Sequence, residues 1–201
     1  LLADSNLDKF RLLPSKCNRN LTSHFHHIHV ENKPFLVGES VLSNIQGIKV
    51  AYPSNGADLK GLIKAAFHDP NPVVMLEHKG LYWSKIPGTE DAKCIEPSRD
   101  YIVPLGKART VLQIEQSENP QCSIITYGRG VYWAQQAANN FQDSVEIIDL
   151  RSIVPVDMEA ISNSVSKTNR CIILTEEPVD NSFGQSLSGR IASEFDTWIF
   201  S

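Results

Sequence analysis

Apolar and polar positions follow a regular pattern from residue 48 onward. Residues 48–52 form a short β-prone run, residues 57–67 carry a helical period, and residues 73–76 are an unbroken apolar run. The helical segment places its apolar residues at i, i+3, i+4 and i+7, and so on one face: Leu59, Leu62, Ile63 and Ala66. The run Asp-Pro-Asn-Pro at 69–72 ends that helix. The pattern predicts a β-α-β unit with parallel strands and a right-handed crossover.

A second α/β region follows residue 105. Its apolar runs and amphipathic stretches predict strands at 123–127, 145–150 and 171–175, and helices at 131–141, 157–167 and 185–194. Strands that alternate with helices are typical of a parallel sheet covered on both faces. The predicted fold class is therefore α/β.

Two stretches lack this regularity. Residues 1–37 are polar and irregular, and residues 77–104 contain three prolines and a turn, which is typical of a linker or a functional loop. The predicted organisation is an irregular segment at 1–37, a β-α-β unit at 38–76, a linker at 77–104 and a parallel-sheet domain at 105–201.

Composition and charge exclude several classes of partner. The chain has 201 residues, 41% hydrophobic and 21% charged, which is ordinary globular usage. A net charge of -4 provides no basic surface, so we expect no nucleic-acid partner. We expect no membrane span either, because no apolar run approaches the roughly 20 residues that one requires, and residues 1–4 do not follow the pattern of a signal peptide.

The cysteines and histidines each suggest a metal site, and each has a plainer explanation. Cys17, Cys94, Cys122 and Cys171 lie far apart without a CxxC pair, which favours free thiols in a reducing compartment. The dense histidine run at 24–29 would place alternate rings on one face of a strand, as a metal pair requires. Because a convincing ligand set is not completed nearby, a solvated segment outside the core is the alternative.

A glycine turn at 128–130 follows a predicted strand and opens a predicted helix. Gly128 and Gly130 would let the backbone approach a pyrophosphate, and Asp149 stands about 20 residues further on, as in dinucleotide-binding folds. Trp133, however, occupies the place of the third glycine. A tight strand-to-helix turn explains the same pattern without a ligand.

Two further groups of oxygen ligands stand at the ends of elements. At the end of helix 57–67, free carbonyls and oxygen-bearing side chains could surround a monovalent cation or simply stop the helix: Ala66, Phe67, Asp69 and Asn71. Glu176 and Glu177 follow an apolar strand, where α/β proteins carry functional residues. Adjacent glutamates more often point to opposite sides, one of them solvated, and Arg151 is a possible ion-pair partner. The chain has no GxSxG, P-loop, HExxH or EF-hand pattern.

Several segments, in this order, resemble the β subunit of thiamine-dependent 2-oxo acid dehydrogenases. The end of that family's pyrimidine-binding domain is similar to GIKVAYPSNGADLKGLIKAAFHDPNPVVMLEHKGLYW, and its entry into a transketolase-type C-terminal domain is similar to DYIVPLGKA. Three later blocks also match: ITYGRGVYWAQQAA, VEIIDLRSIVPVDMEAISNSVSKTNR and EEPVDNSFGQSLSGRIA. The resemblance covers residues 47–201.

The resemblance implies oxidative decarboxylation of pyruvate or a branched-chain 2-oxo acid, with acyl transfer to lipoyl. It implies thiamine diphosphate and Mg²⁺ held largely by an α subunit, and K⁺ at the loop of Ala66, Phe67, Asp69 and Asn71. The implied partners are that α subunit, a second β subunit in a heterotetramer, and a lipoyl acyltransferase core. The implied location is the bacterial cytoplasm, or the mitochondrial matrix in a eukaryote. No catalytic or thiamine-contacting residue of this chain is assigned.

The chain also departs from the family pattern. Residues 1–46 are too short for the whole pyrimidine-binding domain, and its activating glutamate and its His-Ser-Gln stretch have no counterpart there. We therefore expect a fragment or truncated reading frame that is inactive alone. A fragment of transketolase or deoxyxylulose-phosphate synthase, and a nucleotide-binding module built on Gly128 and Gly130, remain alternatives.

Overall fold

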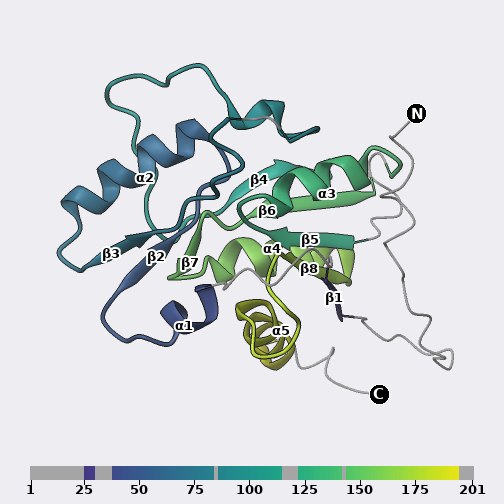
Figure 1. Ribbon diagram of the computed structural model, residues 1–201. Coiled ribbons are helices and arrows are strands. Elements are labelled where there is room, and N and C mark those ends of the chain that lie inside the picture. The colour runs from purple at the N-terminus through teal and green to yellow at the C-terminus, as the bar shows by residue number, and fades with distance from the viewer. Residues whose placement is uncertain (1–24, 30–37, 84–85, 115–121, 142–143, 195–201) are drawn as a thin grey trace, which may run out of the picture.

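The computed structural model describes residues 25–29, 38–83, 86–114, 122–141 and 144–194 (Figure 1). The elements in chain order are β1 (Phe25–His29), α1 (Glu39–Ser43), β2 (Lys49–Ala51), α2 (Gly56–His68), β3 (Val73–Met75), the 3-10 helix η2 (Glu90–Ala92), β4 (Arg109–Leu112), β5 (Cys122–Thr126), α3 (Gly130–Ala138), β6 (Val145–Asp149), β7 (Ser152–Val154), α4 (Met158–Thr168), β8 (Cys171–Thr175) and α5 (Phe183–Glu194).

The larger sheet is built around three parallel strands covered on both faces. Its order is β1-β8-β5-β6-β4, in which β4 pairs antiparallel with β6 and the other neighbours are parallel. Alternate residues of the central strands point to opposite faces. Ile124 and Ile147 pack in a buried cluster with residues of α3, whereas Ile125 and Ile148 pack in another with residues of α4 and α5. The predicted α/β fold with helices on both faces is therefore confirmed.

The smaller sheet joins the two halves of the chain. Its order is β3-β2-β7: β2 and β3 run parallel, as the β-α-β pattern predicts, while β7 adds antiparallel to the other side of β2. Val50 lies opposite Val154, 104 residues later in the chain. Val50 and Tyr52 also belong to the buried cluster that includes α4 and α5. We call this contact between the two halves of the chain the seam. It consists of both backbone hydrogen bonds and apolar packing.

Local signals in the sequence account for where the helices begin. Asn55 accepts the Asp58 N–H at 2.8 Å and so caps α2, and Asp157 caps α4 in the same way through the Ala160 N–H at 3.2 Å. Within α2, a Cβ on Gly61 would lie 2.5 Å from Val103 Cγ2. The glycine therefore lets the segment before β4 pack directly on the helix.

Four elements differ from the expectations drawn from sequence. α1, β4 and β7 were not predicted, and residues 1–37, predicted to be irregular, contain the strand β1 in parallel register with β8. Each of these elements has only three to five residues. Such short runs show little periodicity, and their partners lie far away in sequence. Within the described ranges, no helix is long and apolar enough to cross a membrane.

Candidate functional site

The four ligands predicted for a cation lie together at the C-terminal end of α2. The Asp69 N–H donates to the Ala66 carbonyl at 3.2 Å, and the Asn71 backbone N–H and Nδ2 donate to Asp69 Oδ1 at 3.0 and 3.1 Å. Lys49 Nζ donates to Asp69 Oδ2 at 2.5 Å, which is the main cause of the lowered pKa of Asp69. The Phe67 side chain is exposed, so this residue would contribute its carbonyl oxygen. A lysine ammonium thus already neutralises the one carboxylate of this loop.

A conventional metal centre has no support in the described part of the chain. There, no three His, Cys, Asp or Glu side chains gather in a way that could hold a metal ion. A potassium site would use backbone carbonyl oxygens as well, so the loop at Ala66 and Asp69 stays a prediction.

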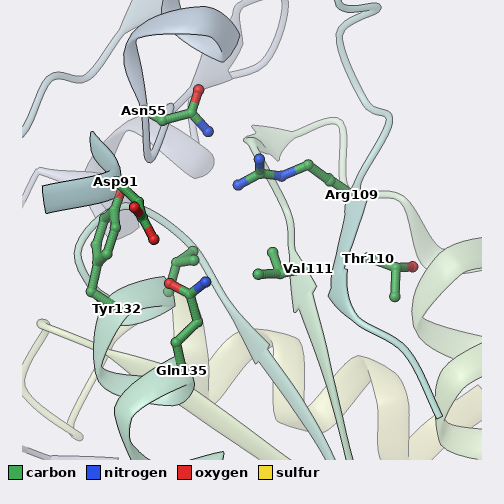
Figure 2. Close-up of a pocket in the computed structure, with 8 residues that line it drawn as sticks. Asn55, Asp91, Arg109, Thr110, Val111, Tyr132 and Gln135 are labelled. Atoms are coloured by element: carbon green, nitrogen blue, oxygen red, sulfur yellow. The ribbon is translucent and has the colours of Figure 1, made fainter. Parts of the chain in front are cut away.

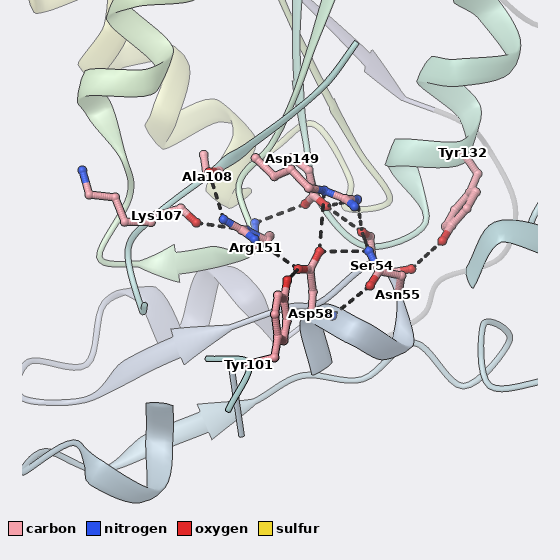
Figure 3. A network of polar contacts seen from close by, with 10 residues as sticks. Ser54, Asn55, Asp58, Tyr101, Lys107, Ala108, Tyr132, Asp149 and Arg151 are labelled. Carbon is pink, nitrogen blue, oxygen red and sulfur yellow. Dashed lines mark hydrogen bonds and ion pairs between the residues drawn. The ribbon is translucent and has the colours of Figure 1, made fainter. Parts of the chain in front are cut away.

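Two buried aspartates and two arginines meet at the seam (Figure 3). We call Asp58, Arg109, Asp149 and Arg151 the arginine cluster, after the ion pairs that join them. Arg109 Nη2 lies 3.2 Å from Asp149 Oδ2, and Arg151 Nη1 lies 3.1 Å from Asp58 Oδ1. Asp58 belongs to the first turn of α2, whereas Arg109 begins β4 and Asp149 ends β6. The ion pairs therefore connect the first half of the chain with the second.

Neutral donors complete the coordination of both carboxylates. Ser54 Oγ donates to Asp149 Oδ2 at 2.6 Å, while Asn55 Nδ2 and the Tyr101 hydroxyl donate to Asp58 at 2.9 and 3.2 Å. The side chains of Asp149 and Asp58 are 0% and 2% exposed. Burial raises the pKa of Asp149, and the Ser54 hydrogen bond and the Arg109 charge oppose that rise. Buried carboxylates of this kind persist only when ion pairs and hydrogen bonds surround them.

Arg151 is held by backbone carbonyls as well as by the Asp58 carboxylate. Its backbone has a left-handed φ of 56°, its Nε donates to the Lys107 carbonyl at 3.1 Å, and its Nη2 donates to the Ala108 carbonyl at 3.0 Å. The expectation that Arg151 pairs with Glu176 or Glu177 is wrong. The guanidinium group of Arg151 instead contacts Asp58 on α2 and the backbone carbonyls of residues 107–108, just before β4.

Three glutamates gather at the other end of the seam, and we call Glu39, Glu176 and Glu177 the glutamate cluster. Glu177 is 1% exposed and accepts the N–H groups of Ser40 and Phe183 at 3.2 and 2.8 Å, together with the Tyr127 hydroxyl at 3.3 Å. Because Ser40 lies on α1 and Phe183 begins α5, this carboxylate ties the two helices together.

The partners of the three glutamates differ sharply. Glu176 is partly exposed, with its carboxylate 3.3 Å from His78 Nε2 and 3.7 Å from Arg129 Nη1. Glu177 is therefore buried, whereas Glu176 is half-buried and paired with His78 and Arg129 instead of being simply solvated. Glu39 is 3% exposed, and within the described residues no cation pairs with it. Burial, with the nearby charges of Glu177 and Glu176, raises the pKa of Glu39 to about 7.

The glycine turn before α3 is explained by packing. Gly128 has a φ of 56°, and a Cβ there would lie 2.9 Å from Tyr52 Cε2; one on Gly130 would lie 2.1 Å from Thr126 Oγ1. Asp149, which a nucleotide would need at its ribose, is instead buried under Ser54 and Arg109. The described structure therefore does not support the nucleotide-binding interpretation of the turn.

The cysteine prediction is confirmed where it can be followed. Cys94, Cys122 and Cys171 are free thiols, and burial raises the pKa of Cys122 to about 11. Cys17 and His24 lie outside the described residues. For the rest of the histidine run the structure gives only the backbone of β1, so a metal site there remains untested.

The sequence reasoning missed Glu39, Asp58, His78 and Arg109 as members of these clusters. Asp58 carried one usable signal, since it stands three residues after the helix cap Asn55. Glu39 and Arg109 are single charges without a motif. Their importance arises from tertiary neighbours more than 35 positions away, namely Glu177 for Glu39 and Asp149 for Arg109.

Two family profiles match the chain. The one described as "Transketolase, pyrimidine binding domain" matches residues 36–84, and "Transketolase, C-terminal domain" matches residues 112–198.

The chain carries a transketolase pyrimidine-binding region followed by a transketolase C-terminal domain.

Curated relatives that match the chain are dehydrogenase β subunits. The chain is 35% identical over 157 residues to the 2-oxoisovalerate dehydrogenase subunit beta of Bacillus subtilis, covering 77% of this chain and 44% of the relative. It is 37% identical over 163 residues to the protein of the same name from Pseudomonas aeruginosa, covering 74% and 44%. To the mitochondrial pyruvate dehydrogenase E1 component subunit beta of Saccharomyces cerevisiae it is 40% identical over 145 residues, covering 70% and 36%. The family resemblance expected from the order of motifs is confirmed.

The chain spans less than half the length of these relatives. Among solved structures, it is similar to a chain described as "Split gene transketolase, inactive beta4 tetramer", with a TM-score of 0.60 and 17% identity over 86% of this chain and 52% of that one. At this identity the likeness shows the fold alone.

Proposed function

We propose that this chain is part of the β subunit of a thiamine diphosphate-dependent 2-oxo acid dehydrogenase that acts on pyruvate or a branched-chain 2-oxo acid. The observation that carries the proposal is its similarity to dehydrogenase β subunits on both sides of the seam, at 35% identity over 157 residues. The arginine cluster and the β2–β7 pairing support it further, because they hold the two matched regions together as one body.

The glycine turn at 128–130 does not fit the diphosphate of thiamine diphosphate. The glycine turn at Gly128 is covered by the Tyr52 ring, and the nearby Arg129 lies over the Trp133 ring and beside Glu176. We therefore propose that the diphosphate and Mg²⁺ are held by an α subunit, and that this chain contributes position and binding surface. On this proposal the chain does not decarboxylate a 2-oxo acid alone.

We further propose K⁺ as a ligand of the loop at Ala66, Phe67, Asp69 and Asn71. Oxygen atoms make up the whole candidate set, as a hard cation prefers. Lys49 competes for the same carboxylate, so a bound cation would have to share Asp69 with it.

The proposed partners are the α subunit, a second β subunit and a lipoyl acyltransferase core. The proposed location follows the organism: the cytoplasm of a bacterium, or the mitochondrial matrix of a eukaryote. The name of the yeast relative describes that protein as mitochondrial.

Co-expression with the α subunit of the same organism tests the proposal. We expect the chain to co-elute with that subunit on size exclusion, and the complex to bind thiamine diphosphate in calorimetry. The isolated chain should bind neither thiamine diphosphate nor NAD. Decarboxylation of pyruvate or 2-oxoisovalerate by the isolated chain, or tight NAD binding, would contradict the proposal.

A further inference from the structure

A cavity of about 300 Å³ opens beside the arginine cluster (Figure 2). Its walls come from the start of α2, from η2, from β4 and from α3. The lining residues are Asn55, Asp91, Arg109, Thr110, Val111, Val131, Tyr132 and Gln135. The cavity is therefore lined by both halves of the chain and requires that the two halves pack against each other.

Arg109 presents a donor to this cavity. Its Nη2 is engaged by Ser54 Oγ at 3.3 Å and Asp149 Oδ2 at 3.2 Å, and its Nε lies 3.6 Å from Asp58 Oδ2. Within the described residues, Nη1 has no recorded partner, and the guanidinium is directed into the cavity in Figure 2. Arg109 is therefore anchored on one side and available on the other.

The opposite wall carries a negative charge. Asp91, on η2, is exposed and makes no recorded hydrogen bond or ion pair with any described residue, and its carboxylate faces the same space as the Gln135 carboxamide (Figure 2). Val111 and Val131 add an apolar surface between these polar groups.

The balance of charge limits which ligands fit. Around the cavity, the carboxylates of Asp58, Asp149 and Asp91 exceed the guanidinium groups of Arg109 and Arg151 by one. A plain anion at Arg109 would add to this excess, and a plain amine at Asp91 would leave the Arg109 donor unused. A ligand with both charges satisfies both walls.

We propose that this cavity binds a small α-amino acid with an aliphatic side chain. Its carboxylate accepts from Arg109, its ammonium group pairs with Asp91, its side chain lies on Val111 and Val131, and Gln135 supplies a further hydrogen bond. Because the charged walls are partly exposed, the expected affinity is weak, roughly millimolar.

The test uses three probes with the same branched side chain on the purified chain. They are L-valine, 3-methylbutanoate, which lacks the ammonium group, and isobutylamine, which lacks the carboxylate. Binding is followed by shifts of backbone amide signals in NMR. We expect L-valine to shift signals of residues 91, 109–111, 131 and 135, and to bind at least about fivefold more tightly than either single-charge probe. Equal binding of the three probes, or shifts elsewhere on the chain, would overturn the proposal.

Two variants locate the contacts without disturbing the ion pairs of the seam. Asp91→Asn should weaken L-valine binding about fivefold while leaving that of 3-methylbutanoate unchanged or stronger. Gln135→Ala should weaken both, and the matched control Asp180→Asn, an exposed aspartate on the loop before α5, should change neither. If Asp91→Asn binds L-valine as tightly as the wild type, the ammonium site is refuted. The outcome does not depend on an α subunit and so is separate from the test of the proposed function.

Discussion

The arginine cluster and the glutamate cluster lie on the same seam and stabilise their buried carboxyl groups in different ways. In the first, Asp58 and Asp149 each have a guanidinium partner within 3.2 Å. In the second, Glu177 has neutral donors, and Glu39 has a pKa raised to about 7. One end of the seam is thus held by charge pairs. The other is held by the neutral donors of Glu177, beside the Glu39 carboxyl group, whose raised pKa favours its protonated form. The comparison shows that stability of the seam depends on different conditions at its two ends.

Removing a cation from the arginine cluster should have the largest effect. Arg151→Ala leaves Asp58 buried without its closest cation and also removes the donors to the Lys107 and Ala108 carbonyls. We expect the free energy of unfolding to fall by about 3–5 kcal/mol, measured by urea denaturation at pH 7. The control Arg170→Ala, at an exposed arginine, should change it by less than about 0.5 kcal/mol. Equal losses in the two variants would mean that the cluster does not fasten the seam.

The glutamate cluster should make the free energy of unfolding depend on pH. The pKa of Glu39 is about 7 in the folded chain and 4.5 at its ordinary value, so between these values the folded state keeps a proton that the unfolded state releases. The stability that the folded chain gains by keeping Glu39 protonated is complete below pH 4.5, declines as the pH rises toward 7, and is lost above pH 7.

Glu39→Gln isolates that contribution, because glutamine keeps the shape without titrating. Relative to the wild type, the variant should gain about 2–4 kcal/mol between pH 4.5 and pH 8, since its unfolding free energy lacks the decline due to Glu39. Denaturation curves at both pH values give the difference, and Glu77→Gln, at an exposed glutamate, serves as the control. Parallel pH profiles for the wild type and Glu39→Gln would refute the comparison between the clusters.

The elements of the fold were largely predictable from sequence, whereas the seam was not. The helix α2 has a periodic apolar face, and the strands β2, β3, β5, β6 and β8 lie in apolar or β-prone runs, which is why they were found. β7 has three residues directly after β6, and nothing local indicates that it leaves the larger sheet for β2. The place of Glu176 and Glu177 after an apolar strand was visible in the sequence, but which of the two is buried was not. Glu39, the neighbour of Glu177, lies 138 positions earlier, and a single-chain pattern carries no signal for that contact.

A hydroxyl in the arginine cluster should matter less than the arginines. Ser54→Ala removes the 2.6 Å hydrogen bond to Asp149 and leaves the Arg109 pair in place. The expected loss is about 1.5–3 kcal/mol of unfolding free energy, typical of a hydrogen bond to a buried charge. Ser166→Ala, at an exposed position of α4, is the matched control. A loss as large as that of Arg151→Ala would show that hydroxyls and not arginines dominate this end of the seam.

The smallest effect is expected outside the seam, at the cation loop. The Lys49–Asp69 pair is partly exposed, so Lys49→Met should cost about 0–1 kcal/mol in NaCl. Without the competing ammonium, K⁺ should raise the melting temperature of this variant more than that of the wild type, and Asp69→Asn should remove the K⁺ effect from both. Thermal melts in matched KCl and NaCl make the comparison. Identical melts in the two salts for all three proteins would argue against the K⁺ site.

The antiparallel pairing of β7 with β2 has a consequence for how this chain may be divided. Two family profiles describe two pieces of sequence, yet β2 has β3 on one side and β7, from the second piece, on the other. A cut within residues 77–104 would strip β2 of a neighbour and leave β7 as a short, apolar edge with unpaired N–H and C=O groups, the kind of edge that promotes aggregation. The two matched regions of this chain are therefore not units that we expect to fold when separated.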